Sequence, residues 1–263
     1  MPDFPTLTRE LVQRLERRVA PELTTPPAGA GPASPTVFQF GQTIASKARG
    51  GRPRNFVFCF GPRELGHLEE ILALYAVDGL EPSFCFTPIG LTREVATALT
   101  AAGFAQREFQ QAILYGLPAA DVPPLAPGVS VERVTVDTVD DFVQTTAQGF
   151  EWPPMWGDAA MEGMRRDFRP EAYCYLARYD GEPAGAGRLE VRDGVGDLGG
   201  GAVLPQFRRK GCHLALLHHR LLVAHRLGCT LVVAAANFGS GSFRNQQRAG
   251  LRLAYIESVW SRE

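Results

Sequence analysis

The residues of this chain best suited to chemistry form a basic turn between an apolar segment and an amphipathic segment. Residues 203–217 read VLPQFRRKGCHLALL, so three cations and Gly211 stand directly before an expected helix. The first turn of a helix has N–H groups without intrahelical partners, and the helix dipole favours negative charge there. The turn is therefore a predicted anion cradle, for which phosphate is the usual occupant.

Histidines and cysteines near this turn do not follow a metal-ligand pattern. No two of the four histidines at 213, 218, 219 and 225 have the i, i+4 spacing that places two ligands on one helix face. The five cysteines are scattered without a repeated spacing. We therefore expect no metal, reduced thiols and a cytoplasmic location.

Length and composition favour a protein of two domains. A chain of 263 residues that is 45% hydrophobic can bury a large core. The net charge of −1, without a basic tail, gives no support for nucleic acid or a membrane surface as a partner. No window reaches the roughly 18 apolar residues of a membrane span. Residues 1–20 lack the apolar run and cleavage site of a secretory signal, so we expect none.

Hydrophobic periodicity predicts an α/β fold with a mixed central sheet flanked by helices. Strands are expected over 36–40, 55–60, 83–87, 108–114, 129–134, 173–179, 184–192, 195–204, 230–235 and 253–259. Helices are expected over 8–19, 62–76, 92–102, 138–148, from the basic turn to Gly228, and over 240–248. The proline-rich residues 21–35 are a predicted linker, and Asp180-Gly181 is a predicted hairpin turn.

The two halves of the chain repeat one order of elements. Four prolines in residues 117–128 mark the best boundary, so we expect domains at 1–125 and 126–263. Each half then reads strand, helix, glycine, strand, helix, glycine, strand. The paired glycines are Gly79 with Gly228 and Gly103 with Gly250, and the two intervals differ by only two residues. A diverged internal duplication explains this agreement, and chance agreement of a common α/β order is the alternative.

The basic turn and the segment after it resemble the GCN5-related N-acetyltransferase (GNAT) family. Arg208 and Gly211 match the family's Arg/Gln-x-x-Gly-x-Gly/Ala pyrophosphate loop, and Val203-Leu204-Pro205 matches the strand end before it. Residues 239–250, GSGSFRNQQRAG, resemble the Gly-Ser-x-Ser-x-Arg-Asn-x-x-Arg-x-Gly pattern of one branch. His213 departs from the family, which prefers a small residue there. The resemblance implies an acyl-CoA N-acyltransferase fold in the second half and a degenerate GNAT-like copy in the first, packed as an internal pseudo-dimer.

The resemblance also implies acetyl-CoA as cosubstrate, bound by the second half. The implied binding residues are Val203, Arg208, Arg209, Lys210, Gly211, Cys212, His213, Asn237, Ser242 and Asn245. Residues 199–202, Gly-Gly-Gly-Ala, suit a splayed strand whose open backbone pairs with pantetheine, and a glycine bulge at a crowded sheet crossing is the alternative. In the first half, Pro62 and Glu64 replace basic residues, so we expect no CoA site there.

Acetyl transfer to an amine needs a base for the ammonium proton and a donor for the departing thiolate. The resemblance points to Glu151, in a loop between helices, and to Glu190, on a strand beside the acceptor, without separating them. The family commonly places a tyrosine acid where this chain has Gln246, which cannot give up a proton. Tyr255, water or no group then protonates the thiolate. Residues 150–156, FEWPPMW, are either an aromatic lid over the acceptor or core packing, and we favour the lid.

These features predict an acetyl-CoA-dependent N-acetyltransferase that acts on a primary amine of a small molecule. The alternative is a CoA-binding protein without turnover, which senses acyl-CoA or holds a partner; the missing tyrosine favours this alternative. We expect a monomer with an internal pseudo-dimer, or a homodimer, and neither nucleic acid nor a membrane as partner.

Overall fold

The computed structural model describes residues 4–16, 36–47 and 55–262, which belong to two compact units. The N-terminal unit comprises Thr6–Ala112 and Ala254–Glu263, and the C-terminal unit comprises Met1–Pro5 and Ile113–Leu253. This division differs from the expected boundary at 125/126, because strands β5 (Ala105–Gly116) and β12 (Arg252–Ser261) each contribute to both units. The expected linker at 21–35 lies outside the described residues.

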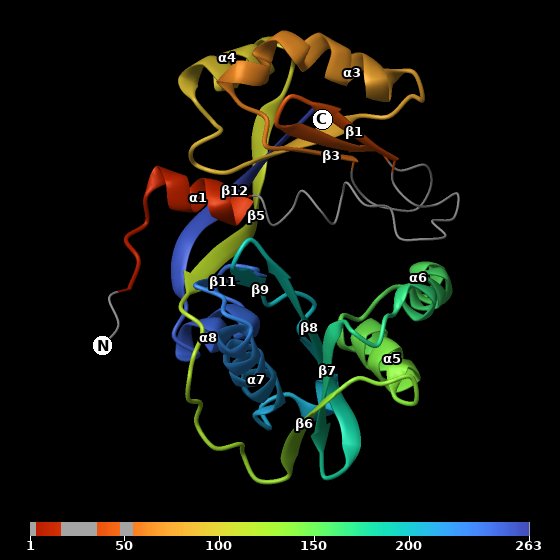
Figure 1. Ribbon diagram of the computed structural model, residues 1–263. Helices are drawn as coiled ribbons and strands as arrows, with labels where there is room; N and C mark the ends of the chain where they lie inside the picture. Colours follow the sequence, from red (N-terminus) through yellow and green to blue (C-terminus); the bar gives the residue numbers. More distant parts are fainter. Residues whose placement is uncertain (1–3, 17–35, 48–54, 263) are drawn as a thin grey trace. The chain divides into compact units, whose positions relative to one another are not determined.

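In the N-terminal unit, a sheet is covered by helices α3 and α4 (Figure 1). Its strands follow the order β1 (Thr36–Phe40), β2 (Thr43–Lys47), β3 (Asn55–Phe58), β4 (Pro82–Phe86), β12. The helical segments are α1 (Arg9–Glu16), the 3-10 helix η1 (Pro62–His67), α3 (Leu68–Ala76) and α4 (Arg93–Ala101). Aromatic rings fill the core, where Phe84 makes edge contacts with Phe60 and Phe104 at centroid distances of 5.2 Å each.

In the C-terminal unit, helices cover both faces of the sheet. Its strands follow the order β5, β11 (Leu231–Ala236), β9 (Val195–Asp197), β8 (Glu182–Arg192), β7 (Tyr173–Tyr179), β6 (Val129–Arg133), and β10 (Ala202–Val203) pairs with β8. Figure 1 shows α5 (Val139–Gly149) and α6 (Pro154–Asp167) on one face, and α7 (Cys212–Arg226) and α8 (Gly241–Arg248) on the other. None of the helices in the described ranges is long and apolar enough to cross a bilayer.

The predicted repetition of elements is visible in the order of the strands and helices. The first half runs β3, α3, β4, α4, β5, and the second runs β9, α7, β11, α8, β12. The first pair of strands is parallel in both halves, β3 with β4 and β9 with β11. The last strand of each half completes the sheet of the other half, since β5 lies beside β11 and β12 pairs with β4.

Two sequence predictions near the basic turn are wrong in detail. The single strand expected over 195–204 is divided into β9 and β10, because the chain turns away at 198–201, where Gly200 has φ +60. The segment expected to be a loop through residue 156 becomes helical at Pro154, where α6 begins. Proline suits the first turn of a helix, whose N–H needs no intrahelical partner. The loop between α5 and α6 is therefore shorter than predicted.

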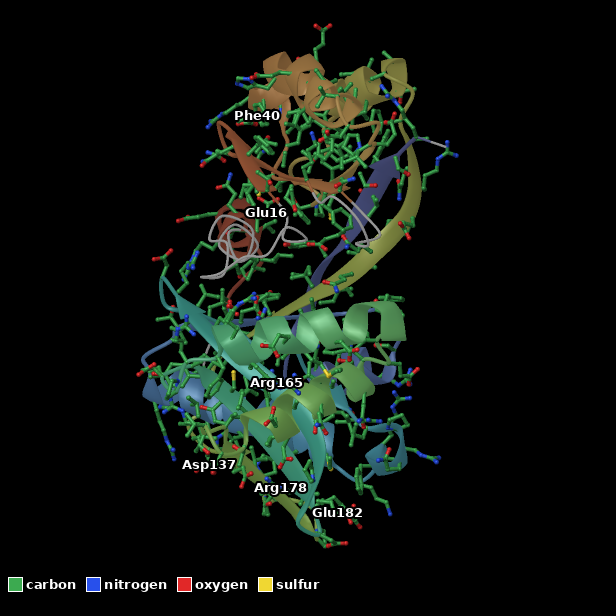
Figure 2. All side chains as sticks on the ribbon, turned by 90° about the vertical axis from the view of Figure 1, so that its right-hand side faces the viewer. Glu16, Phe40, Asp137, Arg165, Arg178 and Glu182 are labelled. Carbon is green, nitrogen blue, oxygen red and sulfur yellow. The ribbon has the colours of Figure 1, made fainter. Side chains whose placement is uncertain are left out.

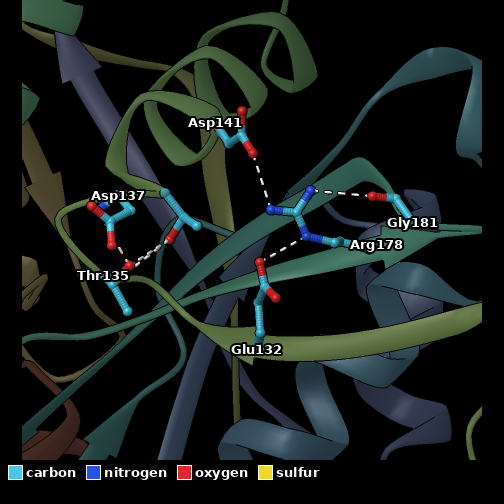
Figure 3. Close-up of polar contacts among 7 residues, drawn as sticks. Glu132, Thr135, Asp137, Asp141, Arg178 and Gly181 are labelled. Atoms are coloured by element: carbon cyan, nitrogen blue, oxygen red, sulfur yellow. Dashed lines mark hydrogen bonds and ion pairs between the residues drawn. The ribbon is translucent and has the colours of Figure 1, made fainter.

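Polar side chains hold both α5 and α6 on their face of the sheet. Arg178 of β7 donates from Nε to Glu132 of β6 at 2.7 Å and from Nη2 to Asp141 of α5 at 3.0 Å (Figure 3). Arg165 of α6, labelled with Arg178 in Figure 2, donates to Asp140 of α5 at 2.6 Å. One exposed ion pair contributes little, but a guanidinium shared between two elements restricts their relative movement. These contacts join the start of α5 to strands β6 and β7 and to the last turns of α6.

Candidate functional site

The structure places an uncapped helix start directly after the basic turn. The N-cap of α7 is Gly211, with φ +92 and no side-chain hydrogen bond to the helix. A Cβ at Gly211 would lie 2.9 Å from Cβ of Ala126, so close packing and backbone conformation both require glycine. Arg209 also has a left-handed backbone, with φ +66. The first turn of α7 thus has no side-chain cap, and the binding of an anion there stays a prediction.

Two of the three cations of the turn already contact neighbouring side chains. Arg208 donates from Nη2 to Oε1 of Glu151 at 2.6 Å, and both side chains are exposed. The ammonium of Lys210 lies 5.2 Å from the ring centroid of Tyr179 at the end of β7. The basic turn is therefore linked to the loop between α5 and α6 by an exposed ion pair and to the β7 end by a cation–π contact.

Strands β9 and β11 part beside this turn. They pair as far as Leu198, whose N–H donates to the carbonyl of Val233 at 2.9 Å, and the chain then continues as β10, which pairs with β8. The segment after the separation is all glycine over 199–201, and β11 ends in alanines at 234–236. Both sequence interpretations of this segment agree with the geometry, since Gly200 makes a bend and the strands diverge there.

Three predicted binding residues meet between α7 and α8. Asn245 accepts from Arg248 at 2.9 Å through Oδ1, so its Nδ2 is the atom that lies 3.4 Å from Nδ1 of His213. An amide N–H only donates; Nδ1 is therefore the acceptor, and the ring proton is on Nε2, 3.4 Å from Oγ of Ser242. Burial, together with Arg220, lowers the pKa of His213 to about 4. His213 is therefore neutral at pH 7.

The remaining predicted binding residues occupy different environments. Asn237 is exposed at the end of β11, and Val203 is buried on β10. Cys212 is 1% exposed, and burial raises the pKa of its thiol, so only its backbone can face a ligand. Within the described ranges, no three histidine, cysteine, aspartate or glutamate side chains gather as a potential metal site.

The candidate bases lie on different elements, and each makes an ion pair. Glu151, with φ +53, pairs with Arg208, whereas Glu190 pairs with Arg188 at 3.1 Å. Tyr255 is buried in the part of β12 that belongs to the N-terminal unit. In the predicted lid, the rings of Phe150 and Trp152 are stacked 6.5 Å apart, while the side chain of Trp156 lies outside the described part.

Gln246 stands on α8, where the resembled family commonly has a tyrosine. It is 3% exposed, and its Nε2 donates to the carbonyl of Ala235 at 3.0 Å and to Ser242 at 3.4 Å. This side chain holds α8 against β11 where that strand has parted from β9. It offers hydrogen bonds but no titratable proton.

The sequence analysis missed Arg220, a completely buried cation on α7. It donates to the backbone carbonyls of Arg188 and Gly199, at 2.8 and 2.9 Å, and therefore supports the segment where β9 ends. The sequence did contain a signal for its burial, because Arg220 stands four residues after Leu216 and next to Leu221, on the apolar face of α7.

Comparisons with known proteins agree with this geometry. Residues 140–246 match the model of the acetyltransferase (GNAT) family. No curated protein sequence matches the chain. A GCN5-related N-acetyltransferase from Kribbella flavida superposes with TM-score 0.65 at 19% identity, covering 87% of this chain and 90% of that one.

Two further solved structures match nearly the whole chain. A tandem GNAT protein from the clavulanic acid biosynthesis pathway has TM-score 0.62 at 13% identity, covering 98% of this chain and 97% of that one. A GNAT-family acetyltransferase from Colwellia psychrerythraea has TM-score 0.56 at 13% identity, covering 99% and 100%. At these identities the likeness shows the fold, including the predicted tandem arrangement of the two halves.

Proposed function

We propose, from the match of residues 140–246 to the GNAT family of acetyltransferases, that the chain transfers acetyl from acetyl-CoA to a primary amine of a small molecule. The observation that carries this proposal is the start of α7, where an uncapped helix N-terminus follows three cations. A pyrophosphate fits this helix start better than a single carboxylate does, because several N–H groups and cations are available to its oxygens.

The residues of the turn fit the pyrophosphate of CoA. The N–H groups of the first turn of α7 would bind phosphate oxygens, with Arg208, Arg209 and Lys210 as counter-charges. The backbone of Gly200 and Gly201 would pair with pantetheine where β9 and β11 part. His213 does not prevent this binding, because its side chain turns toward Ser242 and Asn245 of α8.

Acetyl-CoA supplies an activated acyl carbon as a thioester. The amine nitrogen forms a bond with that carbon, the carbon–sulfur bond breaks, the nitrogen loses a proton to a base, and the thiolate takes up a proton. Glu151 and Glu190 are the candidate bases, and water supplies the thiolate proton; Tyr255, which belongs to the other unit, stays a sequence prediction for that role. Because Arg208 holds Glu151 in the free protein, phosphate binding at Arg208 would release the Glu151 carboxylate for the amine.

The direct test is thiol release from acetyl-CoA in the presence of a panel of primary amines. The proposal expects amine-dependent release with at least one class of amine, together with an acetylated product of the expected mass. Arg208→Ala/Lys210→Ala should raise the KM for acetyl-CoA. If none of the amines accelerates thiol release above hydrolysis, the catalytic proposal is wrong.

A second candidate function is a protein that binds acyl-CoA without turnover. Gln246 favours it, because the position has no proton to give to a thiolate and the amide is engaged with Ala235. This candidate predicts stoichiometric binding of acetyl-CoA without thiol release for any amine. Binding together with release excludes it.

A further inference from the structure

Arg220 is a buried cation whose hydrogen-bond acceptors are all neutral backbone carbonyls. Its side chain is 0% exposed, among the leucines of α7. A Cβ at Gly187 of β8 would lie 3.0 Å from Cζ of Arg220. Position 187 therefore has to be glycine for the guanidinium to fit. Burying a charge is costly unless hydrogen bonds and an opposite charge compensate it. Such an arrangement therefore calls for an explanation.

The protein satisfies only part of this guanidinium. Nε donates to the carbonyl of Leu216 at 3.0 Å, and Nη1 donates to the carbonyls of Arg188 and Gly199 at 2.8 and 2.9 Å. All three acceptors are neutral, and Nη2 has no hydrogen-bond partner among the described residues. Burial lowers the pKa of Arg220 to about 10, although Asp197 acts in the opposite direction. The group therefore stays charged at pH 7 while one of its nitrogens is unpaired.

The unpaired nitrogen faces the glycine segment of the candidate site. A Cβ at Gly201 would lie 3.3 Å from Nη2 of Arg220 and 3.4 Å from Nε2 of His213. Gly201 has no side chain, so both nitrogens border the same backbone position. Nε2 carries the proton of the neutral His213 ring, and its contact with Oγ of Ser242 is long, at 3.4 Å, so both groups can donate beside Gly201. Two donors, one of them cationic, thus converge where β9 and β11 have already parted.

We propose that Arg220 and His213 bind the terminal carboxylate of a short dicarboxylic acyl group, so that malonyl- or succinyl-CoA is preferred to an uncharged acyl-CoA. This inference rests on the proposed function, since it places the acyl end of the thioester beside Gly201. The carboxylate is unchanged by the reaction, because the bonds that form and break are at the thioester carbon.

An anion fits these groups better than a neutral acceptor does. An amide carbonyl of pantetheine would satisfy one N–H of Nη2, but it would add no negative charge to that of Asp197. A carboxylate supplies both the acceptor and the charge, and hydrogen bonds between ionised groups are about twice as strong as neutral ones. The acyl-CoA that compensates Arg220 should therefore be the one that ends in a carboxylate.

The experiment is calorimetric titration of the full chain with two matched pairs of ligands. Succinyl-CoA is compared with butyryl-CoA, and malonyl-CoA with propionyl-CoA, so that each pair has the same number of acyl carbons. We expect the carboxylated member to bind roughly 10- to 100-fold more tightly in at least one pair, the range of a charge-assisted hydrogen bond in a buried site.

Two variants locate the preference. Gly201→Ala puts a methyl group between the carboxylate and both donors, and Arg220→Met removes the cation. Each should bring the affinity ratio of the sensitive pair close to one, whereas Gly163→Ala, whose added Cβ would have only Nη2 of Arg166 within 4 Å, at 3.9 Å, should keep the parent ratio. If Arg220→Met does not fold, the two ligand pairs and the Gly201→Ala variant still test whether a carboxylate binds beside Gly201.

The outcomes separate the two proposals. Equal affinities within both pairs on the parent protein overturn the carboxylate inference and leave the proposed function standing. A strong preference that survives Gly201→Ala also overturns it, because the carboxylate then binds elsewhere. Absence of binding by CoA and by all four thioesters overturns both proposals together.

Discussion

Gly187→Ala should lower the free energy of unfolding of the C-terminal unit, because β8 has no room for a methyl group at this position. The new Cβ would lie 3.0 Å from Cζ, 3.2 Å from Nη1 and 3.3 Å from Nε of Arg220. The guanidinium cannot move away without losing hydrogen bonds to the carbonyls of Arg188 and Gly199. Overpacking costs about 1–3 kcal/mol. One lost bond from a charged donor costs about 1.5–3 kcal/mol.

Alanine offsets part of this loss, because glycine inside a strand is less favourable by about 0.5–1 kcal/mol. The net expectation for Gly187→Ala is a decrease of about 3 kcal/mol in the free energy of unfolding. Gly163→Ala is the matched control, and this helical position should gain about 0.5–1 kcal/mol. Urea unfolding followed by circular dichroism measures both. A Gly187→Ala protein within about 0.5 kcal/mol of the parent, less than the smallest overpacking cost, would show that Arg220 is not tightly held.

Three further predictions follow from the same contacts. Acetyl-CoA should bind once per chain, because buried Glu64 occupies the turn of the first half that corresponds to the basic turn; calorimetry that counts two sites would contradict this. Burial and Arg220 lower the pKa of His213 from its ordinary 6.5 to about 4. As the pH falls, His213 is therefore protonated in the unfolded chain at a higher pH than in the folded protein. The free energy of unfolding should then fall by roughly 2–3 kcal/mol between pH 6.5 and 4. His213→Asn should reduce that loss in urea titrations. If the variant keeps the pH dependence of the parent, His213 is not the cause of the loss. Glu151→Gln should lower kcat yet bind acetyl-CoA up to about five-fold more tightly, because it frees Arg208; weaker binding would mean that the ion pair does not compete with phosphate.

The features that sequence predicted well are those with local causes. The basic turn, the glycine at its end and the helix after it are encoded within a few residues, and the structure keeps that order. Ser240 caps α8 by accepting from the N–H of Phe243 at 3.1 Å, as expected of a serine before a helix. The hairpin at Asp180-Gly181 has positive φ at both positions, which the residue pair favours.

The features that sequence did not predict depend on distant partners. All five residues of β2 are buried, so this strand shows no alternation that could reveal it. The helix α6 begins at Pro154, in a segment that looks like a loop until the helix start is known. The burial of Arg220 depends on hydrogen bonds to backbone carbonyls of β8 and of the segment after β9. The helical periodicity of α7 does not indicate these distant acceptors. The exchange of β5 and β12 between the two sheets likewise depends on pairing across the whole chain.

Calorimetric titration with acetyl-CoA, on the parent and on Arg208→Ala/Lys210→Ala, tests the central claim most directly. The control Arg63→Ala/Arg93→Ala removes two exposed cations from the N-terminal unit and changes the net charge equally. We predict one site in the parent, binding at least roughly ten-fold weaker in the Arg208/Lys210 variant, and parent-like binding in the control. Equal affinity for the parent and the Arg208/Lys210 variant would contradict the assignment of the basic turn as the site that binds the CoA pyrophosphate.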